Sequence, residues 1–120
     1  MALYANLFAH QGADFRTPIR LKDEFSDPVD LTDYVVKGQI RRTFTSSTAW
    51  DFDIILDDVT GGFIIAILRA STSSTMKPGR YVYDIYGKST SGHDTFKIQE
   101  GMIEISPRVT QSIDDPDEES

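Results

Sequence analysis

The stretch that decides the fold is residues 77–86, which read Lys77-Pro78-Gly79-Arg80-Tyr81-Val82-Tyr83-Asp84-Ile85-Tyr86. A Pro-Gly turn leads into a run of aromatic and β-branched residues, and such runs favour a strand. Tyr81, Tyr83 and Ile85 alternate with Val82, Asp84 and Tyr86, so we expect the first set to face the core. A Gly/Ser loop then returns the chain through Thr95 to Ser106, which predicts a hairpin.

The same period of two recurs along the chain and predicts further half-buried strands. Pro18, inside the first of them, cannot donate to a strand ladder and indicates an edge strand. Phe63–Leu68 is apolar throughout, which predicts a strand covered on both faces. The inward sets are Phe15, Thr17 and Ile19 in 13–21, Val36, Gly38 and Ile40 in 35–43, and Trp50, Phe52, Ile54 and Leu56 in 50–56.

About seven short strands at roughly ten-residue spacing are typical of an all-β sandwich or barrel. We predict a single immunoglobulin-like antiparallel β-sandwich over residues 1–110, with a disordered acidic tail over 111–120. Residues 69–76 are expected to form a single helical turn at the end of the sheets. A register change near Glu100-Gly101 is expected, because the apolar phase of the last strand switches there.

Composition excludes several classes of function. The chain has 120 residues, no cysteine and a net charge of −7, and five of its acidic residues lie between Asp114 and Glu119. The remainder has no basic excess to meet phosphates, so we expect no nucleic-acid partner. No apolar run is long enough to cross a bilayer and no export signal is evident, so we expect no membrane association.

The residues that usually carry catalysis or bind metals do not form a convincing site. His10 and His93 lie in glycine-containing loops, which are poor places to hold a preorganised catalytic pair. Asp51 and Asp53 lie about 7 Å apart on one strand face, a spacing suited to a large cation. Alternation alone already requires polar residues there, so an outward polar face is favoured. We therefore expect no enzyme, no cofactor and no metal.

What remains is outward-facing apolar material, which marks protein interfaces when it gathers into a patch. Whether such residues are neighbours depends on strand order, which the sequence does not give. The interface candidates are Tyr4, Phe8, Ile55, Val82 and Tyr86.

Four segments resemble a known family: Asp27-Pro28-Val29-Asp30-Leu31-Thr32-Asp33-Tyr34, Val36–Arg41, Lys77–Asp84 and Glu100–Pro107. The chain is similar there to the small β-sandwich domains of tailed-bacteriophage virion proteins, as found at the N-terminus of baseplate upper proteins and in short tail and neck proteins. The resemblance implies a non-enzymatic virion protein, assembled in the host cytoplasm, that docks on other virion proteins in a symmetric ring or tube. No receptor-binding or coiled-coil region follows Thr110, so we expect a stand-alone component.

Two details of the function stay open at this point. Docking on a neighbour is expected through the apolar candidates or by strand addition at an open edge, such as the strand with Pro18. The alternative function is a calcium-assisted carbohydrate-binding module that uses Tyr86 with Asp51 and Asp53.

Overall fold

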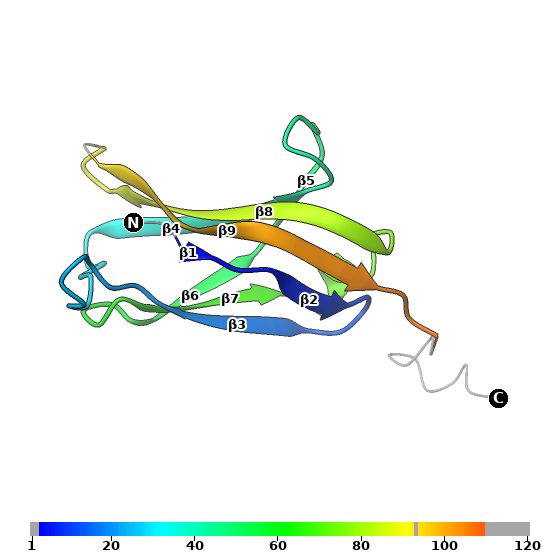
Figure 1. Cartoon of the computed structure of the whole chain (residues 1–120), viewed down its shortest axis with the longest axis horizontal. Coiled ribbons are helices and arrows are strands. Elements are labelled where there is room, and N and C mark those ends of the chain that lie inside the picture. Colours follow the sequence, from blue (N-terminus) through cyan, green and yellow to red (C-terminus); the bar gives the residue numbers. More distant parts are fainter. Residues whose placement is uncertain (1–2, 93, 110–120) are drawn as a thin grey trace.

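Two β-sheets that face each other make up residues 3–92 and 94–109, the part of the chain that the computed structural model describes (Figure 1). The larger sheet has the order β1-β9-β8-β4-β5, with β2 also paired to β9, and the smaller has the order β3-β7-β6. The strands are β1 (Leu3–Tyr4), β2 (Leu7–His10), β3 (Phe15–Arg20), β4 (Tyr34–Arg41), β5 (Ala49–Asp51), β6 (Asp53–Asp58), β7 (Phe63–Leu68), β8 (Gly79–Ser89) and β9 (Thr95–Ser106).

The predicted all-β, two-sheet architecture is confirmed, and every stretch predicted as a strand contains one. The described residues contain nine strands, more than the expected seven. β1 and β2 precede the first predicted strand, and the Trp50–Leu56 stretch is split into β5 and β6. The predicted acidic tail, 111–120, lies outside the described residues.

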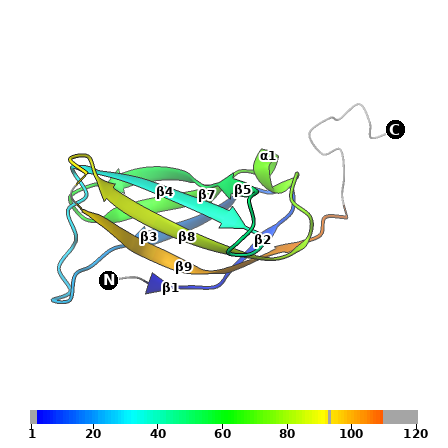
Figure 2. The same cartoon turned by 90° about the horizontal axis from the view of Figure 1, so that it is seen from above.

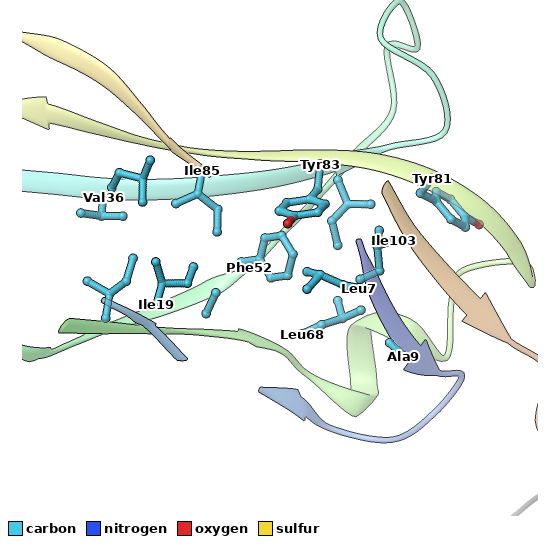
Figure 3. Packing of buried hydrophobic residues seen from close by; sticks show 14 of the residues in the cluster. Leu7, Ala9, Ile19, Val36, Phe52, Leu68, Tyr81, Tyr83, Ile85 and Ile103 are labelled. Carbon is cyan, nitrogen blue, oxygen red and sulfur yellow. The ribbon is translucent and has the colours of Figure 1, made fainter. Parts of the chain in front are cut away.

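The chain breaks between β5 and β6, so β5 belongs to the larger sheet and β6 to the smaller one. Phe52 lies between them, is buried, and donates its backbone N–H to the carbonyl of Gly38 at 2.9 Å. A Cβ at Gly38 would stand 2.9 Å from the Phe52 ring, so only glycine leaves room for that ring. The ring packs edge-on against Tyr83, with centroids 5.8 Å apart, in the middle of the core (Figure 3).

The N-terminal strands run parallel to β9, so the expected purely antiparallel pairing is wrong at this edge. Tyr83 holds this edge from inside: its hydroxyl donates to the carbonyl of Ala5 at 2.6 Å and accepts from the buried Gln99 amide at 2.9 Å. A Cβ at Gly101 would collide with the same Ala5 carbonyl. Gly101 is therefore required for close approach of two backbones.

The register change in β9 lies a little earlier than expected. It falls between Lys97 and Gln99, opposite Ile85 and Tyr86, and not at Glu100-Gly101. Ile98 and Gln99 are consecutive and both buried, which is the mark of an extra residue in the ladder. From that point the inward phase continues to Ile103 and Ile105, as the sequence pattern requires.

The core between the sheets confirms the predicted inward faces. Tyr81, Tyr83 and Ile85 of β8 are buried, and Val36 and Ile40 of β4 are buried beside them (Figure 3). Among the described residues no buried side-chain nitrogen or oxygen atom lacks a hydrogen-bond partner.

The expectation that Phe63–Leu68 is covered on both faces needs correction, because a two-layer sandwich has no third layer. Ile64, Ala66 and Leu68 face the core, while Phe63 and Ile65 are only half-buried. The outward Ile67 is fully buried all the same. Its ladder partner Asp53 forms an ion pair with Arg69 beside it.

The connection from β7 to β8 contains the expected single turn, α1 (Ala70–Ser73). Its first N–H, on Ala70, donates to the carboxylate of Asp14 at 2.7 Å. α1, the end of β9 and the loop before β5 all lie at one end of the sandwich (Figure 2). Among the described residues no helix is long and apolar enough to cross a membrane.

Candidate protein-binding surface

An apolar band crosses the outer face of the larger sheet; it consists of Phe8 on β2, Met102 on β9, Val82 on β8 and Phe44 in the loop after β4. The ladder places Met102 directly opposite Val82. A shallow cavity of about 240 Å³ is lined by Phe8 and Met102, and another of about 100 Å³ by Val82 and Phe44. The four side chains therefore follow one another across three strands and a loop.

The two ends of the apolar band are open to solvent. Phe8 is 68% exposed and Phe44 is 82% exposed, whereas Val82 and Met102 between them are half-buried. Single exposed apolar residues are ordinary, but a contiguous group that includes two phenylalanine rings is typical of an interface. The band thus has the composition of a docking surface, with large aromatic anchors at its margins.

Two ion pairs flank the band, whereas Arg41, opposite Val82 in the ladder and beside Phe44, forms no ion pair among the described residues. Arg80 pairs with Glu104 at 3.6 Å, and Lys97 pairs with Glu100 at 2.9 Å. The ammonium of Lys97 also lies 5.7 Å from the centre of the Tyr86 ring. The hydrogen bond to Glu100 raises the pKa of Lys97, and burial raises the pKa of the Asp84 carboxyl against the opposing effect of Lys97. These pairs leave the apolar side chains uncovered.

The structure brings together only part of the predicted interface. Phe8 and Val82 belong to the apolar band, and Tyr86, 39% exposed, lies farther along β8. Tyr4 is 69% exposed on the edge strand β1, opposite Glu100 in the ladder. Ile55 lies on β6 of the smaller sheet, so it cannot share a surface with the band.

Sequence reasoning missed Phe44 and Met102. Phe44 stands among serines and threonines in a loop, and an isolated phenylalanine in such a loop is itself a signal of an exposed aromatic. The extra residue in β9 reverses the alternation after Ile98 and turns Met102 outward beside Val82.

The aspartates proposed for calcium do not make a common site. Asp51 accepts a hydrogen bond from the Gln39 amide at 3.1 Å in the larger sheet. Asp53 forms an ion pair with Arg69 at 2.7 Å in the smaller sheet. Within 3–92 and 94–109 no three His, Cys, Asp or Glu residues lie close enough to hold a metal ion. The calcium-assisted alternative therefore has no site in this part of the chain.

Ser106 and His10 lie within hydrogen-bond distance, which is one requirement of a serine activated by a histidine. Nδ1 of His10 lies 2.7 Å from Oγ of Ser106. An activated serine needs a third group that orients the histidine, and no carboxylate of the described residues forms a hydrogen bond or ion pair with His10. His93 lies outside the described residues.

Comparisons with known proteins add little to this geometry. No protein family matches the chain by sequence, and no curated protein matches it either. The solved structure of a family 123 glycoside hydrolase from Clostridium perfringens is similar at 13% identity and a TM-score of 0.41. The match covers 89% of this chain and 23% of that one, and a likeness at this level does not bear on function.

Proposed function

We propose that this chain is a non-enzymatic docking subunit that binds another protein through the apolar band. The observation that carries the proposal is the pair of exposed rings, Phe8 and Phe44, at the two ends of a row of four apolar side chains with charged residues beside them. The resemblance of the sequence to phage β-sandwich domains suggests the kind of partner: a component of a bacteriophage tail, baseplate or neck. The place of action is then the virion.

The energy of docking would come from burying the two rings. Truncating an aromatic anchor that a partner fully buries costs an interface about 2 kcal/mol or more. Symmetric assemblies add many such contacts, so a modest contact per subunit is enough in a ring or tube.

Strand addition at an edge remains the second way to dock. β3, with Pro18, pairs only with β7 among the described strands, so its other side is open as expected. The opposite edge strand, β6, carries Asp53, Asp57 and Asp58, and charges of this kind protect an edge against pairing.

The test uses phage particles produced with an affinity-tagged copy of the chain. The wild-type chain is expected to sediment with the particles. Phe8→Asp/Phe44→Asp is expected to reduce its incorporation about tenfold or more, since each tenfold corresponds to about 1.4 kcal/mol. The matched control is Phe25→Asp/Ile55→Asp, because Phe25 is as exposed as these rings but lies in the loop after β3.

Two results would contradict the proposal in different ways. Equal incorporation of the band variant and the control would remove the apolar band as the docking surface. A chain that never sediments with particles, while its band still binds another protein, would refute the virion part alone.

A further inference from the structure

A second hollow lies between the start of β5, the loop after β4 and the segment after α1. Its volume is about 520 Å³, and its lining includes Arg42, Thr48, Trp50, Thr75, Lys77 and Tyr81. We call it the Trp50 cleft. It shares no residue with the apolar band, so whatever binds there is independent of the docking proposed above.

Aromatic packing holds the cleft in shape. Trp50 and Tyr81 meet edge to face with ring centres 5.4 Å apart. The Tyr81 hydroxyl donates to the carbonyl of Lys77 at 2.6 Å, and the Arg42 guanidinium lies 4.8 Å from the centre of the Tyr81 ring. A Cβ at Gly79 would stand 2.7 Å from the guanidinium, so glycine leaves space for Arg42. The indole and the cation are thus positioned before any ligand arrives.

The charge of the cleft is not balanced within the described residues. The three ion pairs formed there use Arg69, Arg80 and Lys97, and none involves Arg42 or Lys77. Two cations beside a half-buried indole suit a ligand with carboxylates and a flat or ring-shaped group. An acidic peptide that contains proline has both features, because proline rings dock on aromatic surfaces.

This chain carries such a peptide itself, Asp114-Asp115-Pro116-Asp117-Glu118-Glu119, outside the described residues. The backbone leaves β9 close to the cleft. The N–H of Arg108 donates to the side-chain oxygen of Gln11 at 3.3 Å, and the amide nitrogen of Gln11 donates to the carbonyl of Met76 at 2.9 Å.

The connecting length is also sufficient. Met76 lies between Thr75 and Lys77, which line the cleft. The six residues from Arg108 to Asp114 span up to about 20 Å when extended, which is enough to reach it.

We propose that the acidic segment Asp114–Glu119 binds in the Trp50 cleft, either of its own copy or of a neighbouring one. Its carboxylates meet Arg42 and Lys77, and Pro116 lies on the indole of Trp50. Attachment to the same chain gives the segment a high effective concentration, so a weak contact is enough to occupy the cleft.

The test uses the fluorescence of Trp50, the single tryptophan of the chain. In the full chain, Asp114→Asn/Asp115→Asn/Asp117→Asn/Glu118→Gln/Glu119→Gln is expected to shift the emission to longer wavelength. The acrylamide quenching constant at least doubles, because the indole loses its cover. Arg42→Gln/Lys77→Gln gives the same change, and about 0.5 M salt reproduces it in the wild type through screening.

The matched control removes acidic side chains at the other end of the sandwich. Glu24→Gln/Asp33→Asn/Asp57→Asn is expected to leave Trp50 unchanged. A synthetic peptide of residues 111–120, added to the neutralised chain, restores the protected emission, and the same peptide with Asn and Gln at the acidic positions does not. The peptide titration keeps the test decisive if a variant folds poorly.

Unchanged emission and quenching in the neutralised chain would overturn the inference, as would an equal response of the control variant. Protection that grows with protein concentration assigns the segment to a neighbouring copy, and protection that does not grow assigns it to the same copy. Phe8→Asp/Phe44→Asp is expected to leave Trp50 unaffected, so failure here and failure of the docking proposal are separate results.

Discussion

Both sheets have apolar side chains beside charged ones on their outer faces, but the exposure of these apolar side chains differs between the two sheets. On the smaller sheet, Ile67 faces outward and is nevertheless fully buried. On the larger sheet, Phe8 and Phe44 face outward and stay largely exposed. Both faces carry arginine or lysine next to the apolar residues, so composition does not account for the difference.

The position of the cations relative to the apolar residues does account for it. On the smaller sheet Arg20 lies over the Phe63 ring at 4.8 Å, and the Arg69–Asp53 pair stands beside Ile67. On the larger sheet Arg80 pairs with Glu104, and Lys97 pairs with Glu100 and lies near the Tyr86 ring, so neither is paired with Phe8 or Phe44. Charged side chains therefore lie over or beside the apolar residues of the smaller sheet, whereas Phe8 and Phe44 stay largely exposed. An outward apolar residue indicates a docking site only where no long charged side chain covers it.

The largest expected effect concerns the core contact between Tyr83 of the larger sheet and Phe52. Tyr83→Ala is expected to lower the free energy of unfolding by about 3 kcal/mol or more, because it leaves a cavity beside Phe52 and an unpaired Ala5 carbonyl. Urea titration measures it. The control is Tyr86→Ala on the outer face of the same strand, with an expected loss below about 1 kcal/mol. A loss of that size for Tyr83→Ala would mean that the core contact is not stabilising.

The next prediction compares the two outer faces directly. Ile67→Ala is expected to cost about 2 to 4 kcal/mol, as a buried aliphatic truncation does. Val82→Ala, at the centre of the apolar band, is expected to cost less than about 1 kcal/mol in the isolated protein. Thermal and urea unfolding give both values. Equal losses of unfolding free energy would show that Val82 is already packed within the chain. The two outer faces would then not differ.

A smaller effect follows from removing the cover of the smaller sheet. Arg20→Ala/Arg69→Ala is expected to cost roughly 1 kcal/mol or less in stability, since exposed ion pairs and cation–π contacts contribute little. Binding of a hydrophobic dye is expected to rise, because Phe63 and Ile67 become accessible. Arg80→Ala/Lys97→Ala serves as the control and leaves dye binding almost unchanged. If both variants respond alike, the arginines do not act as a cover.

The smallest effect concerns the ionisation of Asp84 beside the apolar band. Burial raises the pKa of this carboxyl from its ordinary 3.8, so folding favours its protonated form. Its contribution to stability is therefore present below the unfolded-state pKa and is lost as the pH rises through the folded pKa. Asp84→Asn is expected to raise the melting temperature slightly at neutral pH and to have no such benefit in acid. The gain stays well below about 1 kcal/mol, because Asp84 is only partly buried and solvent screens its charge.

Asp30 provides a control of opposite sign for that pH series. Hydrogen bonds from the side chain and backbone of Thr32 lower the pKa of Asp30. Its contribution is present above the unfolded-state pKa and is lost as the pH falls through the folded one. Asp30→Asn is thus expected to lower the melting temperature at neutral pH and to lose this effect in acid. The same direction of change in both variants would contradict the assignment.

The sequence predicted the inward faces because alternation is a local property. Val36 and Ile40, or Tyr81 and Tyr83, are placed by their neighbours in the chain and need no knowledge of the other sheet. The same locality explains the failures. A strand that passes from one sheet to the other at Phe52 keeps its alternation, so the pattern does not show the break.

The site was less predictable than the fold because it depends on strand order and on side-chain reach. Phe8 and Val82 were recognised as exposed apolars, but their alignment with Met102 follows from pairings across the whole chain. Ile55 met the same criterion and lies on the other sheet. Ile67 lies beside the Asp53–Arg69 ion pair, and that pair is a tertiary contact between β6 and the residue that follows β7.

The parallel pairing of the N-terminal strands with β9 has a mechanical consequence. Leu3 pairs with Gln99 and His10 pairs with Ser106, so the two strands run alongside each other in the same direction. Tension applied through Leu3 and Ser106 pulls the strands in opposite directions along their length. Every hydrogen bond between them is then loaded in shear at once, and none is peeled open first. This pairing is therefore expected to resist tension along the strands, and a pulling experiment through these two ends should require more force than one that peels β5 from the opposite edge.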